Sequence, residues 1–383
     1  MKALERFSTA EIVAVLTVGI VGVLIAGLQP QLLGALAADG RLSVGALGNL
    51  ATVELLAMGV AAGVAGFVLP IGKVRIVAAL AIVATAACDV LTARAGAPAL
   101  FAARIGAGVA EGVLIWVAIG MIVRTANPAR WSGVYLMTQT LAQLVIATAF
   151  GFAILPRFGS TGGFVALGIV SLAALLALLW LPVAYGPLKH ADGHDGVIDG
   201  RPSGRGVLAL IGVVLFLAFE VAVWVYVEPL AHQQKVAAGA IAAIAPLSLA
   251  MQVLGAGAAS VLAGRMPSLP TLLAASAGSL VVLAVMGTTA APAIFVTATA
   301  TFGFLWLFAM PFQVPLVIAA DPTRRAAALV GGAQLVGSSA GPFLASLLVH
   351  DDRVGTVLWF GAACIVASLA FTMASQRRSS TGG

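Results

Sequence analysis

Two stretches of the chain begin and end alike. Residues 97–130 read APALFAARIGAGVAEGVLIWVAIGMIVRTANPAR, and residues 291–324 read APAIFVTATATFGFLWLFAMPFQVPLVIAADPTR. Each holds an apolar run longer than the about 20 residues that a helix needs to cross the ~30 Å hydrocarbon core of a bilayer. A second match follows, because Ala-Gln-Leu-Val occurs at 142–145 and again at 333–336. The spacing predicts two parallel repeats of membrane-spanning helices.

The composition agrees with a membrane protein. Hydrophobic residues make up 61% of the 383 residues and charged residues only 9%, whereas soluble domains carry about 25% charged residues. The chain therefore lacks the polar surface of a soluble globule, and a nucleic-acid-binding protein is excluded despite the net charge of +6. Cys88 and Cys364 both lie in apolar runs, so neither a disulfide scaffold nor a thiolate metal site is expected.

Apolar runs bounded by charges, prolines or glycine-rich turns extend over the whole chain. They predict an all-α membrane protein of twelve transmembrane helices, in two pseudo-symmetric six-helix bundles. The polar stretch 186–205 separates an N-terminal bundle, 1–185, from a C-terminal bundle, 206–383. The expected spans are residues 12–38, 46–69, 74–93, 98–123, 132–156, 160–185, 206–231, 238–264, 270–289, 292–318, 326–349 and 354–375.

The distribution of Lys and Arg predicts the orientation, since cytoplasmic loops retain positive charge. With the N-terminus inside, fourteen of the 20 basic residues fall on the cytoplasmic side, and one, Arg104, lies inside a span. The five on the opposite side are Arg41, Arg94, Arg157, Lys235 and Arg353. We therefore expect a multi-pass protein of the inner membrane with both termini and the central loop 186–205 in the cytoplasm. The first span has no signal-peptide cleavage pattern and is expected to be retained.

Twelve spans in two halves, joined by a cytoplasmic loop, resemble the major facilitator superfamily over essentially the whole chain. The family's fourth-span pattern is similar to Leu100, Arg104 and Gly108 here. The loop 66–75 departs from the family, because Pro70 stands where an acidic residue is usual. The resemblance implies a monomeric secondary transporter without a cofactor, not an enzyme, that works by alternating access.

Three carboxyl groups, Glu54, Glu111 and Glu220, fall near mid-depth of the expected spans, and Arg104 lies inside the same span as Glu111; each needs a partner or a wet cavity. Glu220, Glu111 and Glu54 are candidates for proton coupling, because a carboxyl group removed from water can load and release a proton. Arg104 precedes Glu111 by seven residues and so shares its helix face. Arg104 either binds an anionic substrate or sets the charge of a coupling carboxylate, or it forms a fixed ion pair with Asp89.

Glu220 is the first coupling candidate, because its span is similar to a cavity-lining helix of the family. The alternative is a permanently protonated side chain that is hydrogen-bonded within the bundle. Amides and aromatic rings in the spans are candidates for substrate contact, although interhelical hydrogen bonds and packing explain them equally simply. These candidates are Gln29, Gln143, Gln313, Gln334, Trp116, Trp224 and Trp306. We interpret the loop residues His190, Asp192, His194 and Asp195 as a solvated linker and expect no metal site.

The sequence thus favours a secondary transporter that moves a small organic molecule across the membrane, with proton-coupled efflux as the leading interpretation. Two alternatives stay open: proton-coupled uptake of an organic anion, and a transporter-like protein that handles lipid or acts as a sensor. No phosphate-binding Gly-x-x-x-x-Gly-Lys-[Ser/Thr] motif occurs in the sequence, so no ATP hydrolysis is expected. The partners implied are the substrate, protons and membrane lipid.

Single cysteines in residues 190–200 should react with a membrane-impermeant maleimide only when the cytoplasmic face is open. The expectation rests on the bias of fourteen basic residues against five. Accessibility labelling in whole cells and in inverted vesicles measures it, on a background that lacks Cys88 and Cys364. If these positions are labelled in intact cells but not in inverted vesicles, the loop faces the periplasm and the predicted orientation is wrong.

Overall fold

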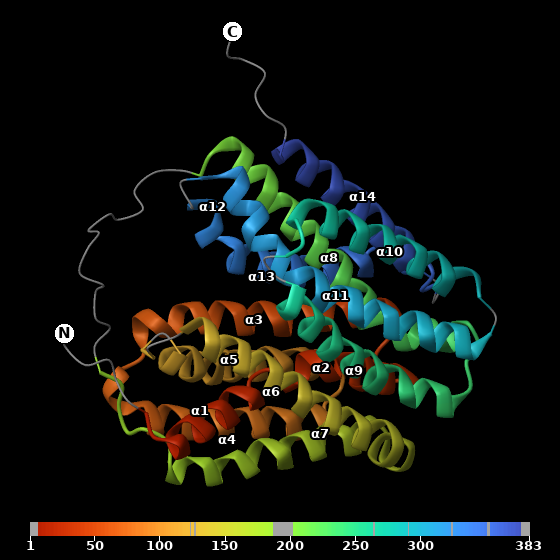
Figure 1. Ribbon diagram of the computed structural model, residues 1–383. Helices are drawn as coiled ribbons and strands as arrows, with labels where there is room; N and C mark the ends of the chain where they lie inside the picture. The colour runs from red at the N-terminus through yellow and green to blue at the C-terminus, as the bar shows by residue number, and fades with distance from the viewer. Residues whose placement is uncertain are drawn as a thin grey trace. The chain divides into compact units, whose positions relative to one another are not determined.

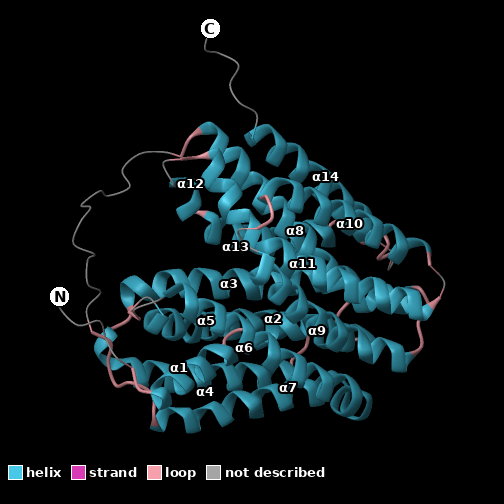
Figure 2. Ribbon diagram, in the orientation of Figure 1, coloured by secondary structure: helices cyan, strands magenta, loops and turns pink. Residues whose placement is uncertain are grey.

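Helices make up every regular element of the residues that the structure describes (Figure 2). The structure is a computed structural model of residues 1–383, and it describes 7–122, 124–125, 128–186, 202–262, 265–289, 291–322, 325–350 and 353–376. The loop residues His190, Asp192, His194 and Asp195 lie outside the described residues. Within these ranges, ten helical segments are long and apolar enough to cross a membrane. The chain is therefore a multi-pass membrane protein.

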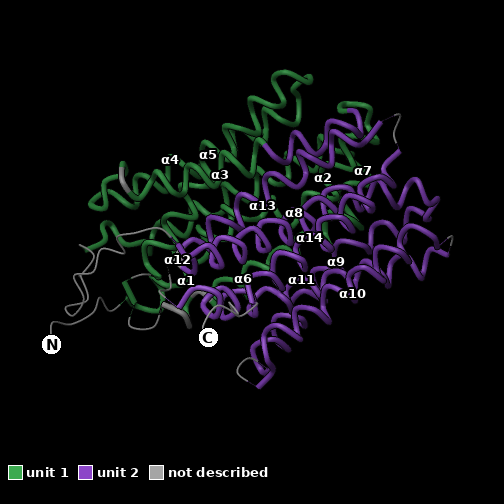
Figure 3. The backbone as a smooth tube through the Cα atoms, turned by 90° about the horizontal axis from the view of Figure 1, so that it is seen from above, with its two compact units in different colours: residues 1–42, 53–194 green, residues 43–52, 195–383 purple. Residues whose placement is uncertain are grey.

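The chain forms two compact units, coloured separately in Figure 3. Unit 1 comprises residues 1–42 and 53–194, and unit 2 comprises residues 43–52 and 195–383. The first turns of one helix, α3 (Leu47–Val68), thus belong to unit 2. There the Gly48 amide donates to the Tyr226 hydroxyl at 3.0 Å, and the Thr52 hydroxyl donates to the Ser339 carbonyl at 2.9 Å.

Unit 1 begins with two helices where one span was expected. A capping box between Ser8 and Glu11 starts α1, and Gly22 and Val23 separate α1 from α2. Together the two helices cover the expected span 12–38. The elements of unit 1 are α1 (Thr9–Val21), α2 (Leu24–Ala38), the rest of α3, η2 (Ile71–Lys73), α4 (Val74–Arg94), α5 (Ala97–Ile122), α6 (Pro128–Ala149), η3 (Phe150–Ile154), α7 (Leu155–Ala173) and η4 (Ala174–Leu179). Figure 1 labels the α helices among them.

A glycine separates the expected fifth and sixth spans. Residues 133–179 form a 47-residue helical segment, about twice the length that one crossing needs. Gly159 breaks it with φ 57° and ψ −160°, a conformation that side chains with a Cβ disfavour. Asp39 fixes this kink, because its carboxylate accepts hydrogen bonds from the Ser160 amide at 2.7 Å and the Ser160 hydroxyl at 2.6 Å.

Unit 2 contains the remaining helices. Its elements are η1 (Val44–Ala46), the start of α3, α8 (Gly204–Gln233), α9 (Ala238–Leu262), α10 (Ser268–Thr288), α11 (Pro292–Ala320), α12 (Arg325–Ala328), α13 (Val330–Ser346) and α14 (Thr356–Gln376). The expected span 326–349 consists of the four-residue α12 and the 17-residue α13. Because α13 is short and residues 133–179 form one segment, the expected count of twelve spans stays a prediction.

Close helix packing is repeated at nearly the spacing seen in the sequence, because Glu54 and Ser248 are 194 positions apart and Gly108 and Gly303 are 195 apart. Helices α4 and α10 both have 21 residues, and their first residues, Val74 and Ser268, are separated by the same 194 positions. In unit 1, a Cβ atom on Gly108 of α5 would collide with the carbonyl oxygen of Glu54 on α3. In unit 2, a Cβ on Gly303 of α11 would collide with the carbonyl of Ser248 on α9. Small residues therefore let the helix backbones approach at matching places.

Replacing Gly108 with Ala should destabilise the protein by about 1–3 kcal/mol, because the added methyl group forces α3 and α5 apart. Gly63→Ala is the matched control. Gly63 is likewise inside a helix, α3, but a Cβ atom there would meet nothing within 4 Å. It should be neutral or stabilising by up to about 1 kcal/mol through helix propensity. Thermal unfolding in detergent compares the two variants, and equal melting temperatures would contradict the packing.

Candidate functional site

A single buried guanidinium organises the charged residues of unit 1. Arg104 on α5 is fully buried, and its Nη1 lies 2.7 Å from Glu54 Oε1 of α3. Its Nη2 lies 2.6 Å from Asp89 Oδ1 of α4, and its Nε donates to the Thr92 hydroxyl at 3.0 Å. The guanidinium carbon also lies 5.1 Å from the ring centre of Phe164 on α7, a cation–π contact. All three nitrogens of Arg104 thus have side-chain partners.

A third carboxyl group, that of Glu111, lies near the two ion pairs of Arg104. Glu111, on the same helix face as Arg104, interacts electrostatically with Glu54 and Arg104. It is 1% exposed, and its Oε2 has no hydrogen-bond partner among the described residues. Three buried carboxyl groups therefore share one cation. If all three were ionised the cluster would carry two uncompensated negative charges, which burial disfavours strongly.

The sequence predicted part of this arrangement. The ion pair of Arg104 with Asp89 is present, together with a second pair to Glu54 that the sequence analysis did not connect to it. The signal for that pair was Gly108, one turn after Arg104. Because Gly108 lets α3 approach closely, the carboxylate of Glu54 comes within reach of the guanidinium.

A buried carboxyl group of unit 2, Glu220, has different surroundings. Glu220 on α8 has no exposed surface, and neither carboxyl oxygen has a hydrogen-bond partner among the described residues. One turn later, Trp224 lies edge-on to Trp306 of α11, with ring centres 6.2 Å apart. Phe302 continues the aromatic row, 5.9 Å from Trp306. Glu220 thus lies on the same helix as one end of this aromatic row.

Comparison with solved structures identifies the fold. The nucleoside transporter NupG matches with a TM-score of 0.72 at 12% identity, over 96% of this chain and 100% of that chain. The xylose transporter XylE from E. coli matches with a TM-score of 0.70 at 15% identity, over 98% and 100%. A bacterial homologue of the human lysosomal transporter Spinster matches with a TM-score of 0.61 at 14% identity, over 96% and 94%. The chain has the major facilitator superfamily fold. No family model matches the sequence.

In this major facilitator fold, the predicted amides divide into two kinds. Gln143 of α6 donates to the Val23 carbonyl at 2.7 Å and so links two helices of unit 1. Gln334 of α13 donates to Gln313 Oε1 of α11 at 3.2 Å. Two buried amide nitrogens, Gln29 Nε2 and Gln313 Nε2, have no hydrogen-bond partner among the described residues.

The aromatic candidates lie in separate units. Trp116 is a buried residue of α5 in unit 1, with its indole nitrogen facing Gly66. Trp224 and Trp306 belong to unit 2, and the indole nitrogen of Trp306 has no hydrogen-bond partner among the described residues. Unit 2 therefore combines an aromatic row with two unpaired donors, Trp306 Nε1 and Gln313 Nε2.

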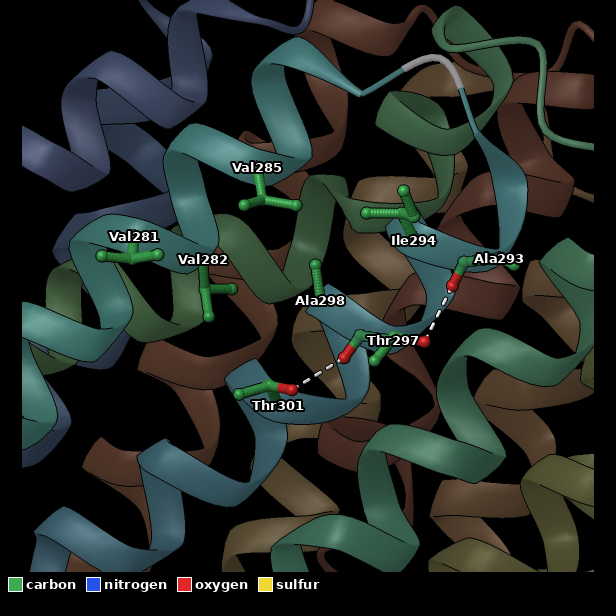
Figure 4. Close-up of a pocket in the computed structure, with 8 residues that line it drawn as sticks. All are labelled: Val281, Val282, Val285, Ala293, Ile294, Thr297, Ala298 and Thr301. Atoms are coloured by element: carbon green, nitrogen blue, oxygen red, sulfur yellow. Dashed lines mark hydrogen bonds between the residues drawn. The ribbon is translucent and has the colours of Figure 1, made fainter.

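A groove between α10 and α11, of about 350 Å³, does not have the polar lining of a substrate site (Figure 4). Its two hydroxyl groups bond to their own helix: Thr297 donates to the Ala293 carbonyl and Thr301 to the Thr297 carbonyl, both at 2.8 Å. The other lining residues are Val281, Val282, Val285, Ala293, Ile294 and Ala298. This groove is an apolar surface suited to lipid chains.

Replacing Arg104 with Gln should destabilise the protein by about 3–5 kcal/mol, since it leaves carboxyl groups buried without their cation. Adding Glu54→Gln and Asp89→Asn to that variant should recover part of the loss. Arg157→Gln is the control, because this exposed guanidinium only contacts the Ala153 carbonyl of its own helix turn, at 3.4 Å. Melting temperatures in detergent measure the series. A triple variant no more stable than Arg104→Gln would contradict the charge balance.

Proposed function

We propose that the chain is a secondary active transporter that works by alternating access and couples the movement of a small organic molecule to proton transfer. The observation that carries the proposal is Glu220, a fully buried carboxyl group without a hydrogen-bond partner among the described residues. Such a group is far less costly to bury as the neutral acid than as the carboxylate. A change that admits water to Glu220 would therefore release its proton.

The charged cluster of unit 1 supports proton coupling and provides the rival carrier. The single charge of Arg104 compensates one of the three nearby carboxyl groups; its ion pairs are with Glu54 and Asp89, not with Glu111. A proton on Glu111 would bring the cluster closer to neutrality. We assign Glu220 the coupling role and Arg104 the role of charge partner to Glu54 and Asp89.

An uncharged, hydrogen-bonding solute is the substrate class that the side chains favour. Arg104 is the one basic residue expected away from the ends of a span, and its three nitrogens are already engaged, which argues against capture of an organic anion. The Trp224–Trp306 pair offers apolar ring faces, and the unpaired Trp306 and Gln313 nitrogens offer donors. Nucleosides and xylose, named for two structures of the same fold, are uncharged solutes of this kind.

The proposed organisation keeps the expectations from the sequence. Two bundles, 1–185 and 206–383, would each contribute six spans around the cytoplasmic loop 186–205, with both termini in the cytoplasm of a cell with an inner membrane. Export is the expected direction. The repeated glycine contacts at Gly108 and Gly303 support the pairing of the halves.

Glu220→Gln should abolish transport driven by a pH gradient while sparing substrate exchange. Glutamine keeps the shape of a protonated Glu but cannot release a proton, so binding and alternation persist while coupling is lost. The purified protein is reconstituted in proteoliposomes and tested with a panel of radiolabelled nucleosides and pentoses. Transport under an imposed pH gradient and counterflow without one are compared, and the sign of the gradient response distinguishes export from uptake.

Glu111→Gln is the matched comparison, because Glu111 is also buried and its Oε2 also has no hydrogen-bond partner among the described residues. If Glu111→Gln loses the gradient response and Glu220→Gln keeps it, the coupling role passes to Glu111. A normal response in both variants would overturn proton coupling through either residue.

A further inference from the structure

A cavity of about 500 Å³ lies within unit 2, where α8 and α10 end and α14 begins. Its wall is apolar, and its rim is polar. The apolar lining residues are Leu280, Leu283, Ala284, Leu358, Trp359 and Ala362. Side chains at the rim are Gln233, Gln234, Thr288, Arg353 and Thr356. Because these helix ends delimit spans, the rim lies at the depth of lipid headgroups, and the wall lies at the depth of acyl chains.

The rim is held in place by hydrogen bonds that use most of its polar groups. Gln233 Oε1 accepts from the amides of Val354 at 3.0 Å and Gly355 at 3.2 Å. The Thr356 hydroxyl donates to the Leu348 carbonyl at 2.9 Å. These contacts fix the backbone that carries Arg353 against the end of α8.

The Arg353 side chain, by contrast, is exposed and makes no hydrogen bond or ion pair with the part of the chain that the structure describes. Trp359, one turn into α14, is 81% exposed, which suits an indole at a membrane interface. A cation and an interfacial indole thus stand over an apolar slot. A guanidinium forms charge-assisted hydrogen bonds to phosphate, so Arg353 can hold the phosphate of a lipid headgroup.

The groove in Figure 4 lacks the charged residue that the Arg353 cavity has. Its lining contains no charged residue, and both of its hydroxyl groups bond to their own helix. It can hold an acyl chain but cannot select a headgroup. The Arg353 cavity combines an apolar slot with a charge, and charge complementarity favours an anionic ligand that carries an apolar tail.

We propose that this cavity is a binding site for one anionic phospholipid, with the phosphate on Arg353 and one acyl chain between Leu283 and Leu358. The site is separate from the proposed transport residues Glu220 and Arg104. Its occupant is a structural lipid that joins the ends of α8, α10 and α14.

The test titrates delipidated full-length protein in detergent with dioleoyl phosphatidylglycerol and follows the melting temperature, which rises when a ligand binds the folded state. Arg353→Gln should need about tenfold more of this lipid for the same shift, since it loses a charge-assisted hydrogen bond to phosphate. Ala284→Phe, which fills the slot, should weaken the response similarly.

Two controls match these changes. Lys235→Gln removes the same charge from the loop after α8 without lining the cavity, and Ala293→Phe makes the same enlargement in the groove of Figure 4. Both should respond to phosphatidylglycerol like the wild type. The proposal is wrong if Arg353→Gln also responds like the wild type, or if Lys235→Gln loses as much as Arg353→Gln. Equal stabilisation by dioleoyl phosphatidylcholine, or by free glycerol 3-phosphate, would likewise overturn it.

Discussion

The ion pairs of Arg104 with Glu54 and Asp89 constrain the whole of unit 1. A guanidinium inside a bilayer is tolerated only where its donors are satisfied, and here the partners come from α3 and α4 while Arg104 itself is on α5. Three helices must therefore keep a fixed register. The glycines of α5 permit it, because Gly108 lets the α3 backbone approach. Phe164 of α7 covers the guanidinium from another side.

The two repeats keep the same packing but differ in charge. The positions 194 residues after Glu54, Asp89 and Arg104 hold Ser248, Leu283 and Ala298. In unit 2 the Ser248 hydroxyl donates to the backbone carbonyl of Thr299 at 2.8 Å, so a simple hydrogen bond occupies the place of the ion pair. The matching helices of unit 2 thus pack closely without these charges.

Sequence reasoning reached the helical architecture because hydropathy and loop charge are local signals that the bilayer imposes strongly. It offered an ion pair with Asp89 as one alternative for Arg104, since both residues lie at similar depth on consecutive spans. It did not connect Glu54 to Arg104, because the approach of α3 depends on the shape of two helix surfaces rather than on depth. The kink at Gly159 lies between the expected spans 132–156 and 160–185, as the sequence indicates. The hydrogen bonds from Ser160 to Asp39, 121 positions away, are a tertiary contact that no local sequence pattern predicts.

The turn at Gly159 also bears on how the chain enters the bilayer during synthesis. The segment 133–179 has one charged side chain, Arg157, which lies in the first turn of α7 just before Gly159, and it contains no long polar stretch. Backbone amides and carbonyls left unpaired in hydrocarbon are costly. Insertion of one part of the segment without the other is therefore disfavoured. We therefore expect the two parts of this segment to insert together, and the contact between Asp39 and Ser160 would then fix the kink against the end of α2.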